Sequence, residues 1–112
     1  MVQQTQQQAA RRLQPYDQWL EDQRVPVYRG HHIADPLTLA LGPWEGRECN
    51  VAFLQLEGLQ GVSEARVTEV APGASLPPLK LAFGEAVYVL QGEGRTTLWA
   101  GDGPKQTLVW RT

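Results

Sequence analysis

Histidine and cysteine side chains supply most nucleophilic and transition-metal sites, and this chain has few of them. Its two histidines, His31 and His32, are adjacent. On a strand they would point to opposite faces, so at most one would reach a site shared with Glu85. We favour a surface loop for this pair over a metal site. The single cysteine, Cys49, excludes an internal disulfide and is more typical of a small apolar side chain than of a reactive thiol.

Several functional classes are excluded by what the sequence lacks. Ser63 and Ser75 have no histidine at a spacing that indicates a serine hydrolase. Residues 92–94, Gly-Glu-Gly, are too short for a nucleotide-binding loop and are typical of a hairpin turn. The net charge of -2 argues against a nucleic-acid partner. Neither a long apolar run nor a signal-peptide pattern occurs, so we expect a cytoplasmic protein with no membrane partner.

One regularly spaced set of residues carries the strongest signal. Gly73 is followed by Leu79 and Leu81, then by Glu85, and then by Gly92. These intervals resemble the first cupin motif, which runs from a glycine through a His-x-His pair and a glutamate to a second glycine. Counted generously, this likeness spans residues 50 to 112. The wider layout, a short helix followed by Tyr-Arg-Gly at 28–30 and Leu-Gly-Pro-Trp at 41–44, is similar to uncharacterised bacterial single-domain cupins. The resemblance implies an all-β fold, the cupin-type antiparallel β-barrel or jelly roll.

The same resemblance implies that the usual metal site of the family is lost. Residues two apart on a strand share a face, so a His-x-His pair aims both imidazoles into the barrel, where a glutamate completes the metal shell. Here leucines occupy both imidazole positions, and leucine has no lone pair. We therefore expect no metal and no cofactor, with Leu79 and Leu81 buried side by side and Glu85 facing the same cavity. Glu85 is interpreted as a structural carboxylate bonded to Arg66 or to the backbone, or as a general acid or base.

The elements that must position these residues follow from periodicity and from turn residues. Residues 1–14 are polar and glutamine-rich, which predicts a disordered or frayed helical tail. Residues 15–24 predict a short helix, with Tyr16, Trp19 and Leu20 on one apolar face. Residues 25–112 form the predicted barrel. Its strands are expected at 37–41, 50–56, 64–70, 85–90, 95–100 and 105–111, and 85–90 is the most convincing because of its Val-Tyr-Val core.

The predicted barrel is incomplete. The second cupin motif would supply a further histidine, and none follows Gly92. We therefore expect a fragment that lacks the C-terminal strands of a longer cupin. The apolar strand at 105–111 would then expose an unpaired edge, and such an edge favours a homodimer.

Three functions remain open, and the catalytic residues, if any, are unknown. The favoured one is a metal-free cupin module that binds a small organic ligand. The second is the N-terminal part of a cupin enzyme, of the metal-dependent oxygenase or isomerase type, whose other site residues lie beyond residue 112. The third is a structural or dimerisation module. The candidate ligand-pocket residues are Leu79, Leu81, Glu85, Arg66 and Trp99, and Trp44 and Trp110 are further aromatic candidates.

Overall fold

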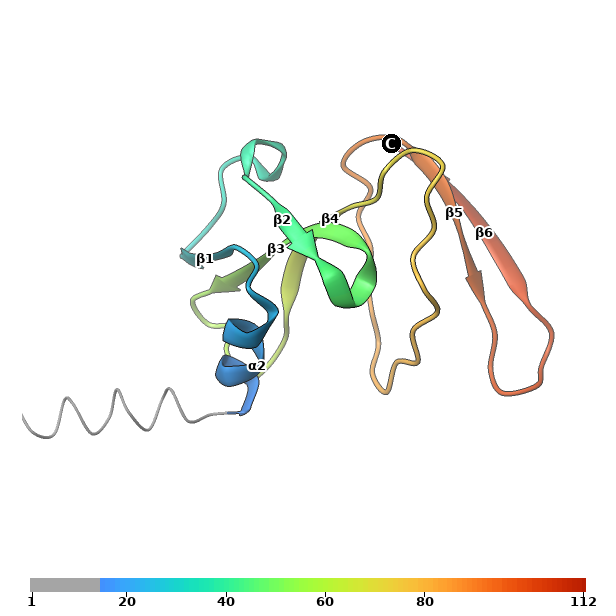
Figure 1. Cartoon of the computed structure of the whole chain (residues 1–112), viewed down its shortest axis with the longest axis horizontal. Coiled ribbons are helices and arrows are strands. Elements are labelled where there is room, and N and C mark those ends of the chain that lie inside the picture. The colour runs from blue at the N-terminus through green and yellow to red at the C-terminus, as the bar shows by residue number, and fades with distance from the viewer. Residues whose placement is uncertain (1–14) are drawn as a thin grey trace, which may run out of the picture. The chain divides into compact units, whose positions relative to one another are not determined.

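The computed structural model describes residues 15–112, so the predicted tail at 1–14 lies outside the described residues. The chain divides into two compact units, Met1–Leu79 and Lys80–Thr112. Across the described residues the fold is mostly β, with six strands in two sheets and one short α-helix (Figure 1). The predicted predominance of β structure is therefore confirmed, whereas the two sheets do not amount to a closed jelly-roll barrel.

The first unit begins with helix α2 (Pro15–Gln23), close to the predicted bounds. Proline suits the first helical position because its missing N–H has no partner there in any case. The helix ends where Arg24 turns into the left-handed region, with φ of 55°. Its apolar face is the predicted one, because Leu20 is buried and the rings of Tyr16 and Trp19 stack 6.0 Å apart.

The sheet of the first unit is organised around the long strand β3 (Cys49–Leu56). Strand β4 (Ala65–Glu69) pairs with it antiparallel. Strand β2 (Gly42–Trp44) pairs antiparallel with the first half of β3, and β1 (Val27–Gly30) pairs parallel with its second half. A strand has only two edges, so β1 and β2 lie end to end along one edge and β4 takes the other. The sheet is thus mixed, which corrects the expectation of a purely antiparallel fold.

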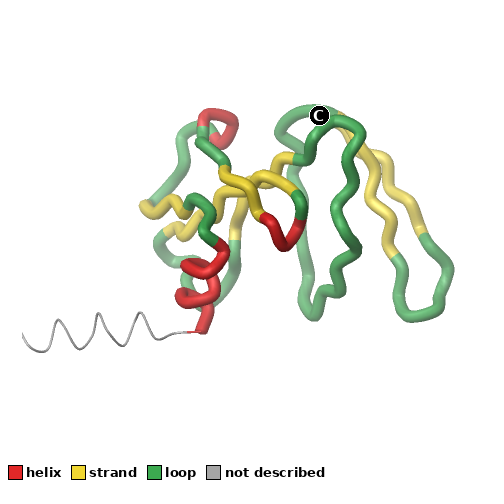
Figure 2. Tube along the Cα trace, in the orientation of Figure 1, coloured by secondary structure: helices red, strands yellow, loops and turns green. Residues whose placement is uncertain are grey.

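Two short 3₁₀ helices connect these strands (Figure 2). The first, Pro36–Thr38, occupies part of the predicted strand at 37–41, which is therefore wrong. The Asp35 carboxylate caps it by accepting a hydrogen bond from the Leu37 amide at 3.0 Å. Asp-Pro favours such a capped turn over an extended strand. The second, Glu45–Arg47, carries the chain from β2 to β3.

The core of the first unit is small and aromatic. Leu20, Trp44, Val51 and Phe53 form it, and Val51 and Phe53 are fully buried. The rings of Trp19, Trp44 and Phe53 meet edge to face, with centroids 5.4–6.1 Å apart. Such edge-to-face pairs add about 0.5–1.5 kcal/mol each beyond the area they bury. The helix is therefore held to the sheet by aromatic packing.

The second unit contains a single β-hairpin, β5 (Glu93–Leu98) and β6 (Gln106–Arg111), paired antiparallel. Glu93 and Gly94 lie within β5, and the hairpin turn lies at 99–105, so the predicted turn at 92–94 is wrong. The predicted strand at 85–90 is also absent, since residues 84–90 have no regular structure. High intrinsic propensity makes a strand only where a neighbouring strand supplies hydrogen bonds. Strands 50–56, 64–70 and 105–111 are confirmed within one or two residues at each end, and 95–100 is shifted by two.

Candidate functional site

The residues predicted to line the barrel interior are exposed. Leu79 is 50% exposed and Leu81 is 42% exposed, so the prediction that both are buried side by side is wrong. Leu79 ends the first unit, and Leu81 and Glu85 belong to the second, where Glu85 is also exposed. The physical reason is that residues 79–90 form no strand: without a ladder, nothing imposes the alternation that would turn these side chains to one face.

Arg66 lies on β4, and its interactions within the first unit include an ion pair and a cation–π contact. Its guanidinium donates to the Glu64 carboxylate at 2.7 Å, and its Cζ lies 5.6 Å from the centroid of the Trp44 ring. Glu64 in turn accepts a hydrogen bond from the Tyr16 hydroxyl at 2.7 Å. Arg66 therefore helps to hold helix α2 against the sheet. Its expected bond to Glu85 stays a prediction.

Tyr16 is the residue whose acidity this arrangement changes most. Burial raises the pKa of its phenol, and the hydrogen bond to the negative Glu64 carboxylate raises it further. Both effects favour the neutral phenol, which donates the hydrogen bond. A second polar link holds the end of the helix, where the Trp44 indole Nε1 donates to the Gln23 side-chain oxygen at 2.8 Å.

Trp99, the aromatic candidate of the second unit, follows β5 and is 46% exposed. The Lys105 ammonium lies 5.0 Å from the centroid of its ring, a cation–π contact that bridges the hairpin turn. Trp110 is part-buried on β6 and donates its indole N–H to the Thr96 hydroxyl at 3.0 Å. Both tryptophans thus contact residues of their own hairpin.

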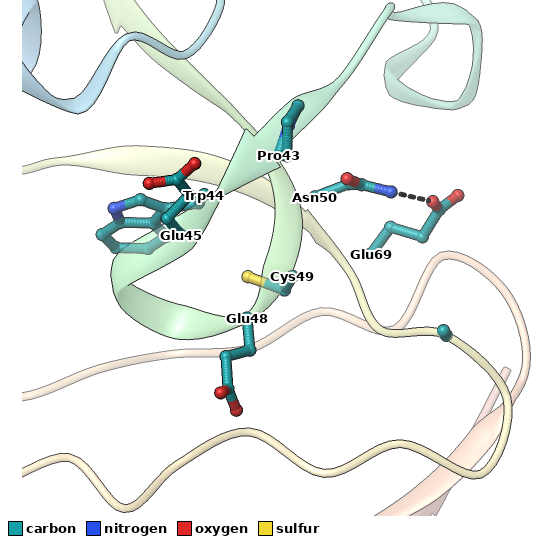
Figure 3. Close-up of a pocket in the computed structure, with 8 residues that line it drawn as sticks. Pro43, Trp44, Glu45, Glu48, Cys49, Asn50 and Glu69 are labelled. Atoms are coloured by element: carbon teal, nitrogen blue, oxygen red, sulfur yellow. Dashed lines mark hydrogen bonds between the residues drawn. The ribbon is translucent and has the colours of Figure 1, made fainter.

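The first unit has a hollow that sequence reasoning missed, with a volume of about 240 Å³. It lies at the start of β3, which β2 and β4 flank on opposite edges, and it includes residues of the chain that connects β2 to β3 (Figure 3). We call it the β2–β4 hollow. The residues that line it are Pro43, Trp44, Glu45, Glu48, Cys49, Asn50, Glu69 and Ala71.

The polar groups of the hollow are mainly carboxylates. Glu45, Glu48 and Glu69 contribute one each, and the Asn50 amide donates to Glu69 at 3.1 Å. Glu48 stands at φ of 57°, the left-handed conformation that ends the 3₁₀ turn. The lining residues thus include three glutamates together with Trp44 and Cys49, a composition that favours a positively charged or hydrogen-bond-donating guest. The lining residues come mainly from β2, β3 and β4 and from the 3₁₀ turn at Glu45–Arg47, so no local motif predicts the hollow.

Cys49 is the only nucleophilic sulfur in the sequence. Burial raises the pKa of its thiol, and the positive charges of Arg47 and Arg66 oppose that shift only in part. A thiol with a raised pKa stays protonated and reacts slowly, since the thiolate is the nucleophile. The interpretation of Cys49 as a small, partly buried side chain fits its intermediate exposure and its packing against the core.

His31 and His32 follow β1 and are both exposed, in agreement with the surface-loop interpretation. Within residues 15–112, histidine, cysteine and acidic side chains do not form a group of three that could hold a metal ion. Over the same residues, every helix is too short or too polar to cross a membrane. No protein-family model, curated protein or solved structure matches this chain.

Proposed function

We propose that this chain is a metal-free cupin-type module that binds a small organic ligand without covalent chemistry. The observation that carries the proposal is the β2–β4 hollow, a site with an aromatic wall and three carboxylates. The cupin part of the proposal rests on the residue spacing from Gly73 to Gly92, with leucines at both imidazole positions. A leucine pair cannot hold a transition metal.

The chemistry of the hollow selects the ligand class. Its volume of about 240 Å³ is below the roughly 300–1,000 Å³ of most ligand pockets, so the ligand has a single ring or a short chain. The carboxylates favour an ammonium or guanidinium group, and the Trp44 ring and Ala71 favour an apolar body. A small organic amine meets both requirements.

Binding without catalysis is the form of the proposal that fits the reactive groups in the hollow. The Cys49 thiol stays protonated because burial raises its pKa. The only basic side chains in the hollow lining are carboxylates, and a carboxylate is a weak base for a thiol whose pKa is raised. Acyl transfer through Cys49 needs a base to take its proton.

A titration followed by two-dimensional amide NMR tests this function. Benzylamine should cause saturable shifts at Glu48, Cys49 and Asn50, and benzoate, which has the same ring and the opposite charge, should not. Glu48→Gln should weaken binding of benzylamine several-fold. Glu57→Gln, a control in the turn after β3, should leave it unchanged. Equal shifts with both probes, or none with benzylamine, would overturn the proposed ligand class.

The second candidate is the N-terminal part of a cupin enzyme. The observation that favours it is the apolar segment at 81–88, which is exposed and has no strand partner among residues 15–112. About one tightly held iron, manganese or zinc per purified chain would overturn the metal-free module. Low metal is expected of both candidates, because the other ligands of the enzyme would lie beyond residue 112. Reading the coding sequence downstream of codon 112 separates them: a continuing frame with a Pro-x-Gly turn followed by a histidine supports the enzyme, and a stop codon supports the module.

A further inference from the structure

The β5–β6 hairpin is amphipathic, and its register assigns the faces. On one face, Gly94 lies opposite Trp110 and Thr96 lies opposite Leu108. On the other face, Arg95 lies opposite Val109. The Trp110 ring covers Gly94 so closely that a Cβ there would lie 2.5 Å from the ring. The ring therefore packs directly on the Gly94 backbone, although no residue of Lys80–Thr112 is buried.

Backbone geometry determines which amides of β6 point away from β5. The Thr112 amide donates to the Gly92 carbonyl at 2.9 Å, which extends the hairpin by one hydrogen-bonded pair. Hydrogen-bonded and non-hydrogen-bonded pairs alternate along an antiparallel ladder. The even-numbered residues of β6 therefore bond to β5. The N–H and C=O groups of Thr107, Val109 and Arg111 point to the outer edge.

That outer edge has no strand partner within residues 15–112, since the second sheet consists of β5 and β6 alone. An isolated two-stranded hairpin is at best marginally stable in water. An unpaired edge of β-branched and apolar residues is also a template for a further strand. The hairpin thus lacks a third strand that would stabilise it, and the outer edge of β6 is a surface to which such a strand can pair.

We propose that the outer edge of β6 pairs antiparallel with β6 of a second copy of this chain, centred on Val109. In this register Val109 lies opposite its own counterpart, and Thr107 lies opposite Arg111 of the second copy. All three outward-pointing residues of each copy then form hydrogen-bonded pairs. The result is a continuous four-stranded sheet with a two-fold axis, the commonest symmetry of protein oligomers.

The absence of facing like charges favours the β6 edge over the β5 edge for this contact. Antiparallel pairing of β6 with itself brings no two like charges opposite one another, because its only charged residue, Arg111, meets Thr107. The corresponding outward residues of β5 are Glu93, Arg95 and Thr97, and pairing centred on them would place Arg95 against Arg95. Like charges directly opposite destabilise a sheet. The occupant of the β6 edge is therefore a self-complementary strand, and Leu108 meets Trp110 of the second copy on the apolar face.

Proline substitutions test the edge selectively. Val109→Pro removes an amide that points outward, so the bonds between β5 and β6 remain while the proposed contact is lost. Arg95→Pro removes the equivalent outward amide from the β5 edge and is the matched control. By sedimentation equilibrium from 1 to 100 µM, the native chain and Arg95→Pro should be dimers at the upper concentrations, and Val109→Pro should be a monomer. Val109→Lys, which places two ammonium groups together at the axis without a backbone change, should also be a monomer.

Cross-linking tests the register. In a Cys49→Ser background, Val109→Cys should form a disulfide-linked dimer under mild oxidation, because Cα atoms of a hydrogen-bonded pair lie about 5.5 Å apart, within disulfide range. Thr97→Cys on the other edge should not. A native chain that stays monomeric at 100 µM, or a dimer that persists in both Val109→Pro and Val109→Lys, would overturn the proposal. So would open-ended assembly in place of a dimer. None of these outcomes bears on ligand binding in the β2–β4 hollow.

Discussion

Strands β3 and β6 each contain a valine beside other apolar residues, and the two strands have different surroundings. β3 is paired along both edges, by β1 and β2 on one side and β4 on the other, and its Val51 is fully buried. β6 is paired along one edge only, and its Val109 is 84% exposed. The same residue type in the same secondary structure thus occupies opposite environments. The difference shows that burial in this chain depends on how many neighbours a strand has, and much less on its own composition.

The largest expected effect comes from the centre of the β3 core. Phe53→Ala should lower the free energy of unfolding of the first unit by about 3–5 kcal/mol, because it removes a fully buried ring that contacts Trp19 and Trp44. Urea denaturation followed by tryptophan fluorescence measures the loss. A cost below about 1 kcal/mol would mean that the aromatic cluster does not hold the unit together.

A matched valine pair tests the comparison directly. Val51→Ala should cost about 2 kcal/mol, from two buried methyl groups and the cavity they leave. Val109→Ala removes the same atoms from an exposed site and should change stability by less than about 0.5 kcal/mol. Both are measured at 1 µM by urea denaturation, so that association through β6 contributes little. Equal costs would contradict the contrast between the two strands.

The polar link between helix α2 and the sheet is expected to have a smaller effect. Tyr16→Phe removes the hydrogen bond to Glu64 and should cost about 0.5–1 kcal/mol at neutral pH. Glu57→Gln, at an exposed turn position, is the control in the same denaturation measurement.

The raised pKa of Tyr16 gives this link a pH dependence. The folded state holds the phenolic proton more tightly than the unfolded chain, so the contribution to stability is complete below the ordinary tyrosine pKa of about 10. Above that pH the unfolded chain ionises first, and this contribution falls as the pH rises. The native chain should therefore lose more stability than Tyr16→Phe between pH 8 and pH 11. Parallel losses in the two proteins would show that Tyr16 is not responsible.

The smallest and most local effect is expected in the hairpin. Gly94→Ala places a Cβ against the Trp110 ring, which must move and give up its hydrogen bond to Thr96. Fluorine NMR of 5-fluorotryptophan protein should show one shifted resonance, that of Trp110, while the stability of the first unit stays within about 0.5 kcal/mol. Thr96→Val removes the hydrogen bond without a clash and should shift the same resonance less. A change in the Trp44 resonance would contradict the expectation that the effect of Gly94→Ala stays within the hairpin.

Local sequence patterns predict helix α2 and strands β3 and β4 of the first unit, but not β1 or β2. Pro15, the spacing of Tyr16, Trp19 and Leu20, and the turn at Arg24 predict helix α2 because these signals act within one or two helical turns. Strand β3 is recognisable from its run of apolar residues. β1 is missed because its four residues carry no strong pattern and gain their structure by pairing with distant β3.

The candidate site is much harder to predict. The β2–β4 hollow depends on how Glu48, Asn50 and Glu69 come together through strand register, which no local spacing encodes. The expectation for Leu79, Leu81 and Glu85 needs a strand at 85–90, and a strand requires a partner as well as propensity. Motif spacing can indicate that residues would share a face, but only a completed ladder places them there.

The parallel pairing of β1 with β3 also sets an order of events during folding. β2 and β4 are joined to β3 by short connections, so their antiparallel contacts close small loops and form at low entropic cost. The Phe53 amide donates a hydrogen bond to the Pro26 carbonyl at 2.9 Å, and this contact joins residues much farther apart in the chain. β1, and the helix α2 that precedes it, should therefore dock last, on a three-stranded nucleus that is already formed. Mutations in α2 would then speed unfolding while leaving the rate of folding nearly unchanged.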